Sequence, residues 1–298
     1  MARADGAGWV LDAPEPVGDL TSLFPRLMAR AGGAAVALGV DFPLGLPRAY
    51  AATRPEAGFP AFLAGLRDRP AFFSVCARLD QISPDRPFYP ARGMRGMTRA
   101  AHADALGLAD ARALSRACDR ATRTRPAGAP LFWTLGANQT GKAALSAWRD
   151  LLLAAPAAPA LLLWPFAGPF RTLLAPGTVA LAETYPAEAL RQLGLRLAGS
   201  KRRQGDRAAL AEGLIAALAR LAVRSTPALG TAIATGFGAD AAGEDRFDCV
   251  LGVLAVLGVL TGARPDTAPP DPWVQNWEGW VLGQTDWPPD WPPARWPD

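Results

Sequence analysis

The sequence has three cysteines, one histidine and very little lysine, and this scarcity excludes several classes of protein. Cys76, Cys118 and Cys249 are widely spaced and form no Cys-x-x-Cys pair, which argues against a disulfide framework and against a cysteine zinc site. His102, the single histidine, has no recognisable nucleophile partner, so serine or cysteine hydrolase chemistry is not expected. A reducing cytoplasm is the compartment that this composition favours.

Long hydrophobic runs are also missing. The most apolar run, residues 249–260, is shorter than the roughly 20 residues that cross a bilayer, and it predicts a buried core helix. Residues 151–170 are apolar too, but Pro156, Pro159 and Pro165 interrupt them, which favours a strand with its loops. The N-terminal residues contain no apolar signal core. We therefore expect a cytoplasmic protein without a membrane partner.

The overall composition is typical of a globular protein. Of the 298 residues, 50% are hydrophobic and 19% are charged, which places the chain far from disordered proteins. The net charge of +4, from 31 basic and 27 acidic residues, is too small to require a nucleic-acid partner, although a local basic patch can still provide one. Residues 285–298 are rich in proline and tryptophan and predict a loose tail.

Apolar runs alternate with helical patterns along the chain. Strands are predicted at residues 8–12, 34–41, 131–136, 178–183 and 277–284, and the run at 34–41 is expected to be buried on both faces. Helices are predicted at residues 18–31, 104–123, 141–153, 186–195, 206–224 and from about 245 onward. This alternation predicts an α/β fold with a sheet that is at least partly parallel.

Carboxylates follow two of the predicted strands, at Asp41 and Glu183, and each is soon followed by a proline. In open α/β sheets ligands bind beyond the carboxyl ends of the strands, so these two acids meet at one edge if their strands are parallel neighbours. Asp245 and Asp248 lie three residues apart at the start of a helix and share one face. Oxygen ligands without histidine or cysteine suit Mg²⁺ or Mn²⁺, and two such ions can hydrolyse a phosphodiester.

Each acid also has a purely structural explanation. Asp41 can organise the turn at Pro43, and Glu244 and Asp245 are favoured by the dipole at the start of a helix. Glu183 alone indicates no function. Only the combination of the three places along the chain favours a metal site.

The same segments resemble a known family. In chain order they are GVDFPLGLP, LFWTLGANQTGKAAL, AETYPAEAL, KRRQGDR, GEDRFDCVLGVLAVL and EGWVLGQ, and the match touches most of the chain from residue 8 to 284. As a set they are similar to the nucleases grouped as domain-of-unknown-function family 429. The resemblance implies an RNase H-like fold akin to the RuvC resolvase, with Asp41, Glu183, Asp245 and Asp248 as the acids that hold divalent metal.

The sequence departs from that family at its beginning. Relatives open with a central strand that carries an Asp, whereas residues 8–17 of this chain already resemble the second strand. Asp5 has only four residues before it, too few for a central strand. Three explanations are open: the start of the sequence is placed too far downstream, the chain has lost this strand, or Asp5 is a poor substitute for the missing acid. Without the first acid, a catalytically degenerate protein, which binds nucleic acid or acts as a scaffold, is the main alternative to an active enzyme.

A third possibility is a nucleotide-binding loop. Residues 136–142, GANQTGK, have the glycine and lysine spacing of a P-loop and lie between a predicted strand and a predicted helix. Ala143 stands where Ser or Thr would hold Mg²⁺, which argues against ATP hydrolysis. Lys142 at a helix start can still bind an anion.

Two groups of basic residues are candidates for phosphate binding. Arg112, Arg116 and Arg120 recur at helical spacing and predict a basic stripe, and Lys201 and Arg202 begin a second group that Arg203 and Arg207 complete. A solvated helix face explains either group equally well.

We therefore predict one RNase H-like domain over residues 1–284, with a mixed sheet flanked by helices, a large helical and loop insertion at about 48–175, and the tail at 285–298. The expected function is Mg²⁺- or Mn²⁺-dependent phosphodiester hydrolysis on nucleic acid. The expected metal ligands are Asp41, Glu183, Asp245 and Asp248, and the expected substrate-binding residues are Lys142, Lys201 and Arg202.

Overall fold

The computed structural model describes residues 1–93, 96–136, 140–155 and 159–290. The described part is an α/β fold with two three-stranded sheets and helices around them, which confirms the predicted α/β class. The strands are β1 (Ala2–Asp5), β2 (Gly8–Leu11), β3 (Val36–Val40), β4 (Ala160–Leu163), β5 (Thr178–Glu183) and β6 (Val223–Ser225). One sheet has the order β1-β2-β6 and the other the order β3-β5-β4, so the strands do not form the single mixed sheet that we expected.

The helices fall into two groups along the chain, one before β4 and one after β5. The α-helices are α1 (Leu23–Arg30), α2 (Arg48–Ala51), α3 (Phe59–Gly65), α4 (Arg99–Ala105), α5 (Thr140–Ser146), α6 (Pro186–Gln192), α7 (Gln204–Ala208), α8 (Ala211–Arg220), α9 (Pro227–Ala234) and α10 (Gly243–Leu260). Short 3₁₀ turns include η1 (Leu66–Asp68), η2 (Pro70–Phe73), η3 (Leu79–Gln81), η4 (Ala111–Leu114), η5 (Ala117–Asp119) and η7 (Phe170–Leu173). Two π-helical segments are η6 (Ala147–Leu152) and η8 (Val274–Glu278).

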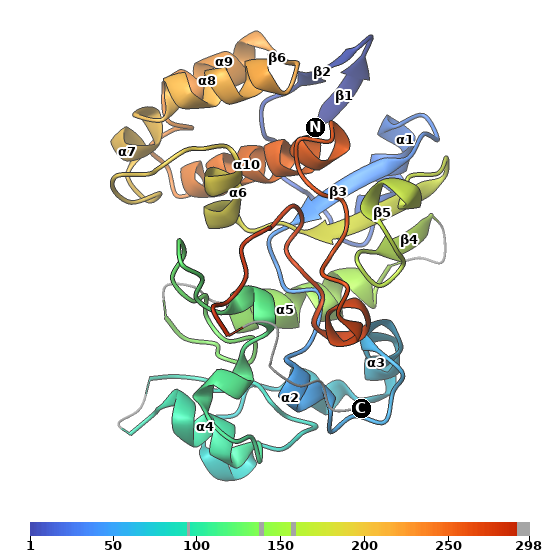
Figure 1. The fold of residues 1–298 in the computed structure, drawn as a ribbon, viewed down its shortest axis with the longest axis vertical. Coiled ribbons are helices and arrows are strands. Elements are labelled where there is room, and N and C mark those ends of the chain that lie inside the picture. Colours follow the sequence, from blue (N-terminus) through green and yellow to red (C-terminus); the bar gives the residue numbers. More distant parts are fainter. Residues whose placement is uncertain (94–95, 137–139, 156–158, 291–298) are drawn as a thin grey trace.

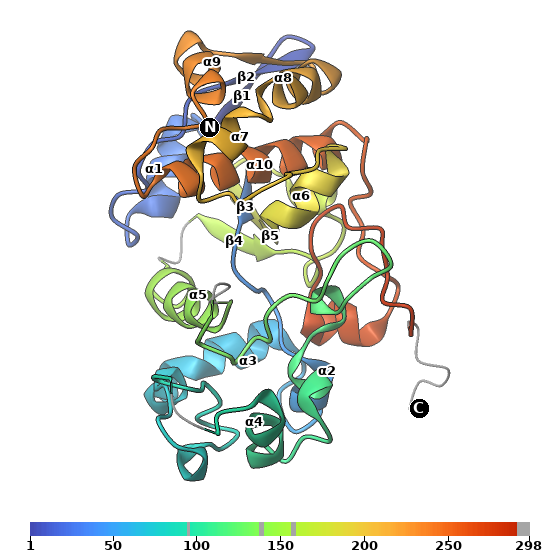
Figure 2. The same ribbon diagram turned by 90° about the vertical axis from the view of Figure 1, so that its left-hand side faces the viewer.

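Helix α10 lies between the two sheets (Figure 1). The sheet β1-β2-β6 with α8 and α9 covers one side of it, and β3-β5-β4 lies on the other side (Figure 2). Buried residues from Phe247 to Val259 point in all directions around this helix, as expected for a helix inside a core. The predicted core helix is confirmed. Within the described residues, none of the helices combines the length and the apolar character that a bilayer crossing requires.

The parallel sheet β3-β5-β4 has different partners on its two faces. Strand β3 pairs with β5 so that Val40 lies opposite Glu183, and alternate residues of a strand point to opposite faces. Val36, Leu38 and Val40 belong to the core shared with the helices α2–α5, whereas Ala37 belongs to the core shared with α10. Strand β3 is an edge strand and its residues are only half-buried, so the expectation of a fully buried strand was wrong.

A glycine lets α10 approach β3 closely. A Cβ atom at Gly39 would lie 2.8 Å from Thr184 Cγ2 and 2.9 Å from Val256 Cγ2 of α10. Gly252 of α10 faces the same threonine, with Thr184 Oγ1 at 3.2 Å from its Cβ position. This contact places the first turns of α10, including Asp248 one turn before Gly252, beside the carboxyl end of β3.

Gly39→Ala is expected to lower the free energy of unfolding by about 1–3 kcal/mol, because the added methyl group overpacks the contact between β3 and α10. Gly205→Ala in α7 is the matched control, since a Cβ there meets nothing within 4 Å and alanine favours a helix by up to about 1 kcal/mol. Urea unfolding of both variants measures the difference. Equal stabilities of the two variants would contradict the close approach.

The N-terminal residues form a strand in spite of their small number. Strand β1 makes an antiparallel hairpin with β2 through a turn at Gly6, which has a positive φ of 59°. It is an edge strand with mostly exposed residues, and Asp5 forms a salt bridge with Arg224 of β6. Asp5 therefore stands on the exposed rim of the other sheet and not on a central strand beside Asp41.

Three predicted elements have a different structure. Residues 131–136, all of which the structure describes, form no strand and contribute only an isolated bridge between Trp133 and Tyr89. The predicted helix at 104–123 is replaced by the end of α4 and the turns η4 and η5. The predicted strand at 277–284 is a π-helical segment followed by one bridge from Val281 to Glu183. Within the predicted insertion of about 48–175, residues 160–163 form β4 of the parallel sheet, and we refer to the helices and loops of residues 48–155 as the insertion.

Candidate functional site

Asp41 and Glu183 stand at the carboxyl ends of neighbouring parallel strands, as the sequence predicts, but on opposite faces of the sheet. Glu183 is the last residue of β5 and pairs with Val40, so Asp41 is one position further along the neighbouring strand. One residue reverses the direction of the side chain. Glu183 therefore faces the insertion, and Asp41 faces α10.

On the insertion side, Glu183 is held by a buried arginine. Arg116 Nη1 and Nη2 each donate a hydrogen bond of 2.7 Å to one oxygen of Glu183, and the backbone N–H of Leu44 adds a third at 2.9 Å. The same guanidinium binds Asp119 with bonds of 2.8 Å and 3.0 Å. Both oxygens of Glu183 are thus engaged, and neither is left for a metal ion in this arrangement.

Arg116 is fully buried and remains charged. Burial works against its charge, yet the carboxylates of Asp119 and Glu183 outweigh burial and raise the pKa of the guanidinium above its ordinary value. The residue belongs to the predicted basic stripe, but the turns η4 and η5 point it inward. The stripe therefore does not exist as a surface feature, because its middle member lies in the core.

On the α10 side, Asp41 joins four charged residues that we call the Asp41 cluster: Asp41, Lys201, Glu244, Asp245 and Asp248. Lys201 Nζ lies 2.5 Å from Asp248 Oδ2 and 3.6 Å from Glu244 Oε1. Asp41 is exposed and accepts no hydrogen bond from the described residues. The second oxygen of Asp248, Oδ1, is buried and has no hydrogen-bond partner among the described atoms.

The pKa values of the cluster reflect burial and the crowding of like charges. Desolvation by the surrounding protein and the negative charge of Asp248 raise the pKa of Asp41 to about 7, and Lys201 opposes the shift. Burial also raises the pKa of Asp248, against the effect of Lys201. Perturbed carboxylates that remain open to solvent are typical of functional sites.

The donor set fits a single hard cation better than a pair. Among the described residues, no group of three or more His, Cys, Asp or Glu side chains lies close enough to hold a metal ion. Mg²⁺ is commonly held by one or two carboxylates together with water and substrate phosphate. Asp41, which accepts no hydrogen bond from the described residues, and Asp248, whose Oδ1 is unpaired, are two carboxylates of this kind.

Arg207 holds the backbone of Lys201 next to the loop before α10, a role that the sequence pattern did not indicate. This buried side chain donates hydrogen bonds to the carbonyl of Lys201, to Gly236 O at 2.8 Å and to Gly238 O at 2.5 Å. Gly236, Phe237 and Gly238 all have positive φ, so successive carbonyls turn toward the guanidinium. The glycine-rich loop before α10 is thus a cradle for Arg207, which ties the segment of Lys201 to the start of α10.

The remaining predicted substrate-binding residues lie on the surface. Arg202 is exposed, and its Nε is 4.0 Å from Glu244 Oε2, at the rim of the Asp41 cluster. Lys142 is exposed on α5, which lies on the insertion side of the sheet (Figure 1). Of the candidate P-loop, residues 137–139 lie outside the described residues, and no strand precedes it in the described segment 131–136. The context that a P-loop requires is therefore missing on its N-terminal side.

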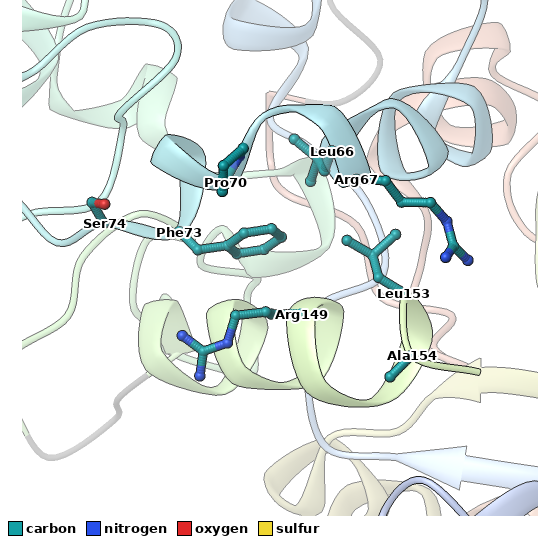
Figure 3. A pocket seen from close by; sticks show the side chains of 8 residues that line it. All are labelled: Leu66, Arg67, Pro70, Phe73, Ser74, Arg149, Leu153 and Ala154. Atoms are coloured by element: carbon teal, nitrogen blue, oxygen red, sulfur yellow. The ribbon is translucent and has the colours of Figure 1, made fainter.

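A hollow of about 540 Å³ lies apart from both groups of acids, between η1, η2 and η6. Its floor is apolar, with Leu66, Phe73 and Leu153, and the guanidinium groups of Arg67 and Arg149 point outward from opposite sides (Figure 3). None of the eight described lining residues is a carboxylate, so this hollow adds no metal ligand.

Comparison of the chain with family models, with curated proteins and with solved structures gave no match. The chemistry of the site consequently has to be argued from its own residues. These are an accessible carboxylate at a strand end, a second carboxylate with a buried unpaired oxygen, and a lysine between them.

Proposed function

We propose that the protein is a divalent-metal-dependent phosphodiester hydrolase that acts on nucleic acid, built on an RNase H-like arrangement of strand-end and helix acids. The observation that supports this proposal most strongly is the convergence of Asp41, after β3, with Asp248 of α10, which keeps one buried oxygen free. These two side chains are the proposed ligands of one Mg²⁺ or Mn²⁺ ion.

The residues of the cluster have separate roles in this proposal. Bound there, the ion would supply Lewis-acid polarisation of the scissile phosphate. Lys201 neutralises one oxygen of Asp248 and thereby orients the other, and its ammonium group attracts the phosphate. Arg202 at the rim adds positive charge for the nucleic-acid backbone. Asp245 lies on the same helical face as Asp248 and adds negative charge that favours a cation.

Glu183 has a different role from the one predicted from the sequence. Its bonds to Arg116 and Leu44 make it a buried anchor for the segment after Asp41. The same bonds favour the second candidate, a catalytically degenerate protein that binds nucleic acid without cleaving it, because a third acidic ligand is then missing. Metal binding and cleavage distinguish the two candidates.

The experiment is a Mn²⁺ titration followed by thermal unfolding and by cleavage assays on single-stranded, duplex and branched oligonucleotides. We expect Mn²⁺ to raise the Tm of the wild type, and Asp41→Asn and Asp248→Asn to abolish this rise and to reduce cleavage by about 100-fold or more. Asp240→Asn is the control, since Asp240 is exposed, pairs with Arg246 and does not belong to the Asp41 cluster. A Tm that Mn²⁺ does not change, together with absent cleavage, would leave the degenerate protein as the better description.

Asp41→Asn also has a signature in the absence of metal. The pKa of Asp41 in the folded protein, about 7, lies above its value of 3.8 in the unfolded chain, so stability from this group is full below pH 3.8 and is lost as pH rises through 7. The asparagine variant is therefore expected to have a higher Tm than the wild type at pH 8 and no advantage at pH 4. A lower Tm at pH 8 would indicate a structural role instead.

A further inference from the structure

We propose that four arginines beside the site form a docking surface for the phosphates of nucleic acid, and that the C-terminal residues 285–290 cover this surface with two aspartates. The tail-covered surface is defined by Arg112, Arg120, Arg123 and Arg191. This inference rests on the proposed function and names how its substrate is held and regulated.

Two carboxylates of the tail hold the arginines in place. Asp286 Oδ2 accepts a bond of 2.7 Å from Arg191 Nη2 and another from Thr124 Oγ1, and Arg123 contributes further positive charge. Asp290 Oδ2 pairs with Arg112 and lies 3.5 Å from Arg120 Nη1. The hydrogen bond from Thr124 and the charge of Arg191 lower the pKa of Asp286. Anions thus already lie at the positions where phosphates would bind.

Water reaches the ion pairs between the tail and the arginines, so these pairs are exchangeable. The side chains of Arg112 and Asp290 are 56% and 41% exposed, those of Arg191 and Asp286 are 29% and 34% exposed, and ion pairs that water reaches are weak. The tail is also attached by the ring of Trp287, centred 5.5 Å from that of buried Trp280, by a bond from Gln284 Nε2 to Asp286 O, and by Pro288, which is buried. A polyanion can therefore displace the carboxylates without disturbing the core.

The tail-covered surface is linked to the end of β5 and to Tyr185. The segment that carries Arg112 and Arg120 also carries Arg116, which holds Glu183 at the end of β5. Arg125 of the same segment places its guanidinium 5.7 Å from the ring of Tyr185. Burial raises the pKa of Tyr185, and the charges of Asp41 and Lys201 also contribute to this pKa. In Figure 2 the C-terminal segment runs beside this part of the chain, toward the side where α6 lies. Tyr185, the second residue after β5, thus connects the segment of these arginines with the surroundings of the Asp41 cluster.

The test measures binding of labelled single-stranded and duplex oligonucleotides to the full chain in EDTA, so that cleavage plays no part. Asp286→Asn with Asp290→Asn is expected to tighten binding about tenfold. The dependence of log K on log salt becomes steeper, because more arginines become available to release counterions. The matched control is Asp80→Asn with Asp85→Asn, which removes two exposed, arginine-paired carboxylates elsewhere.

An affinity gain no larger than that of the control pair, or an unchanged salt slope, would overturn the inference. A gain seen with anionic lipid vesicles but not with oligonucleotides would overturn it as well. Because the assay contains no metal, its result is separate from that of the nuclease test. Tighter binding without Mn²⁺-dependent cleavage would support the tail-covered surface while removing the hydrolase, and the reverse result would remove only the surface.

Discussion

Replacing Arg116 by methionine is expected to lower the free energy of unfolding by about 3–5 kcal/mol, because the carboxylates of Glu183 and Asp119 then remain in the core without a counter-charge. Arg116 is 0% exposed and makes four bonds of 2.7–3.0 Å to these two groups. For a domain of this size the loss corresponds to a Tm lower by on the order of 10 °C. Calorimetry and urea unfolding measure both quantities.

Two further variants test the physical reason for that loss. Arg112→Met removes a neighbouring arginine whose ion pair is exposed, and we expect it to cost under about 1 kcal/mol. Adding Glu183→Gln and Asp119→Asn to Arg116→Met neutralises the buried charges and should restore part of the stability. If Arg116→Met were no more damaging than Arg112→Met, the bridge between the insertion and the end of β5 would not be a main support of the fold.

Acid is expected to destabilise the protein through His102, by about 2 kcal/mol between pH 8 and pH 5. This side chain is fully buried on α4, and its Nε2 donates to Pro87 O at 2.8 Å, so a second proton must go to Nδ1. Nδ1 has no hydrogen-bond partner among the described atoms, and burial lowers the pKa of His102 to about 4. Acid lowers the stability because the pKa of His102 in the folded protein lies below its pKa in the unfolded chain. Stability from this group is present above pH 6.5 and is lost as pH falls toward 4.

His102→Gln isolates this contribution. Glutamine can still donate to Pro87 O but cannot take up a proton, although it loses the ring contacts with Tyr89 and Trp133. We expect the variant to be less stable than the wild type at pH 8 and to lose less stability between pH 8 and pH 5. Comparing the two pH profiles also removes the titration of Asp41, which has the opposite sign. Parallel profiles would show that His102 does not titrate in this range.

The sequence predicted the elements that depend on local pattern. The apolar runs that end in Asp41 and Glu183 are strands β3 and β5, and the most apolar run is the buried helix α10, as expected. Each of these is marked by a continuous apolar stretch bounded by glycine or proline, a signal that lies within about twenty residues. The segments that failed are 104–123, 131–136 and 277–284, and their structure follows from contacts with distant residues such as Glu183 and Tyr89.

The candidate site divides in the same way. Sequence alone determined which acids stand at the strand ends and on the first turns of α10, because position along a strand or helix is a local property. Only the tertiary structure decided which of them meet. Pairing of Val40 with Glu183 puts Glu183 and Asp41 on opposite faces of the sheet. Arg116 packs on the face of Glu183, and Lys201 lies with Asp248 on the face of Asp41. Register and burial are set by contacts between residues far apart in the chain, so no short pattern contains them.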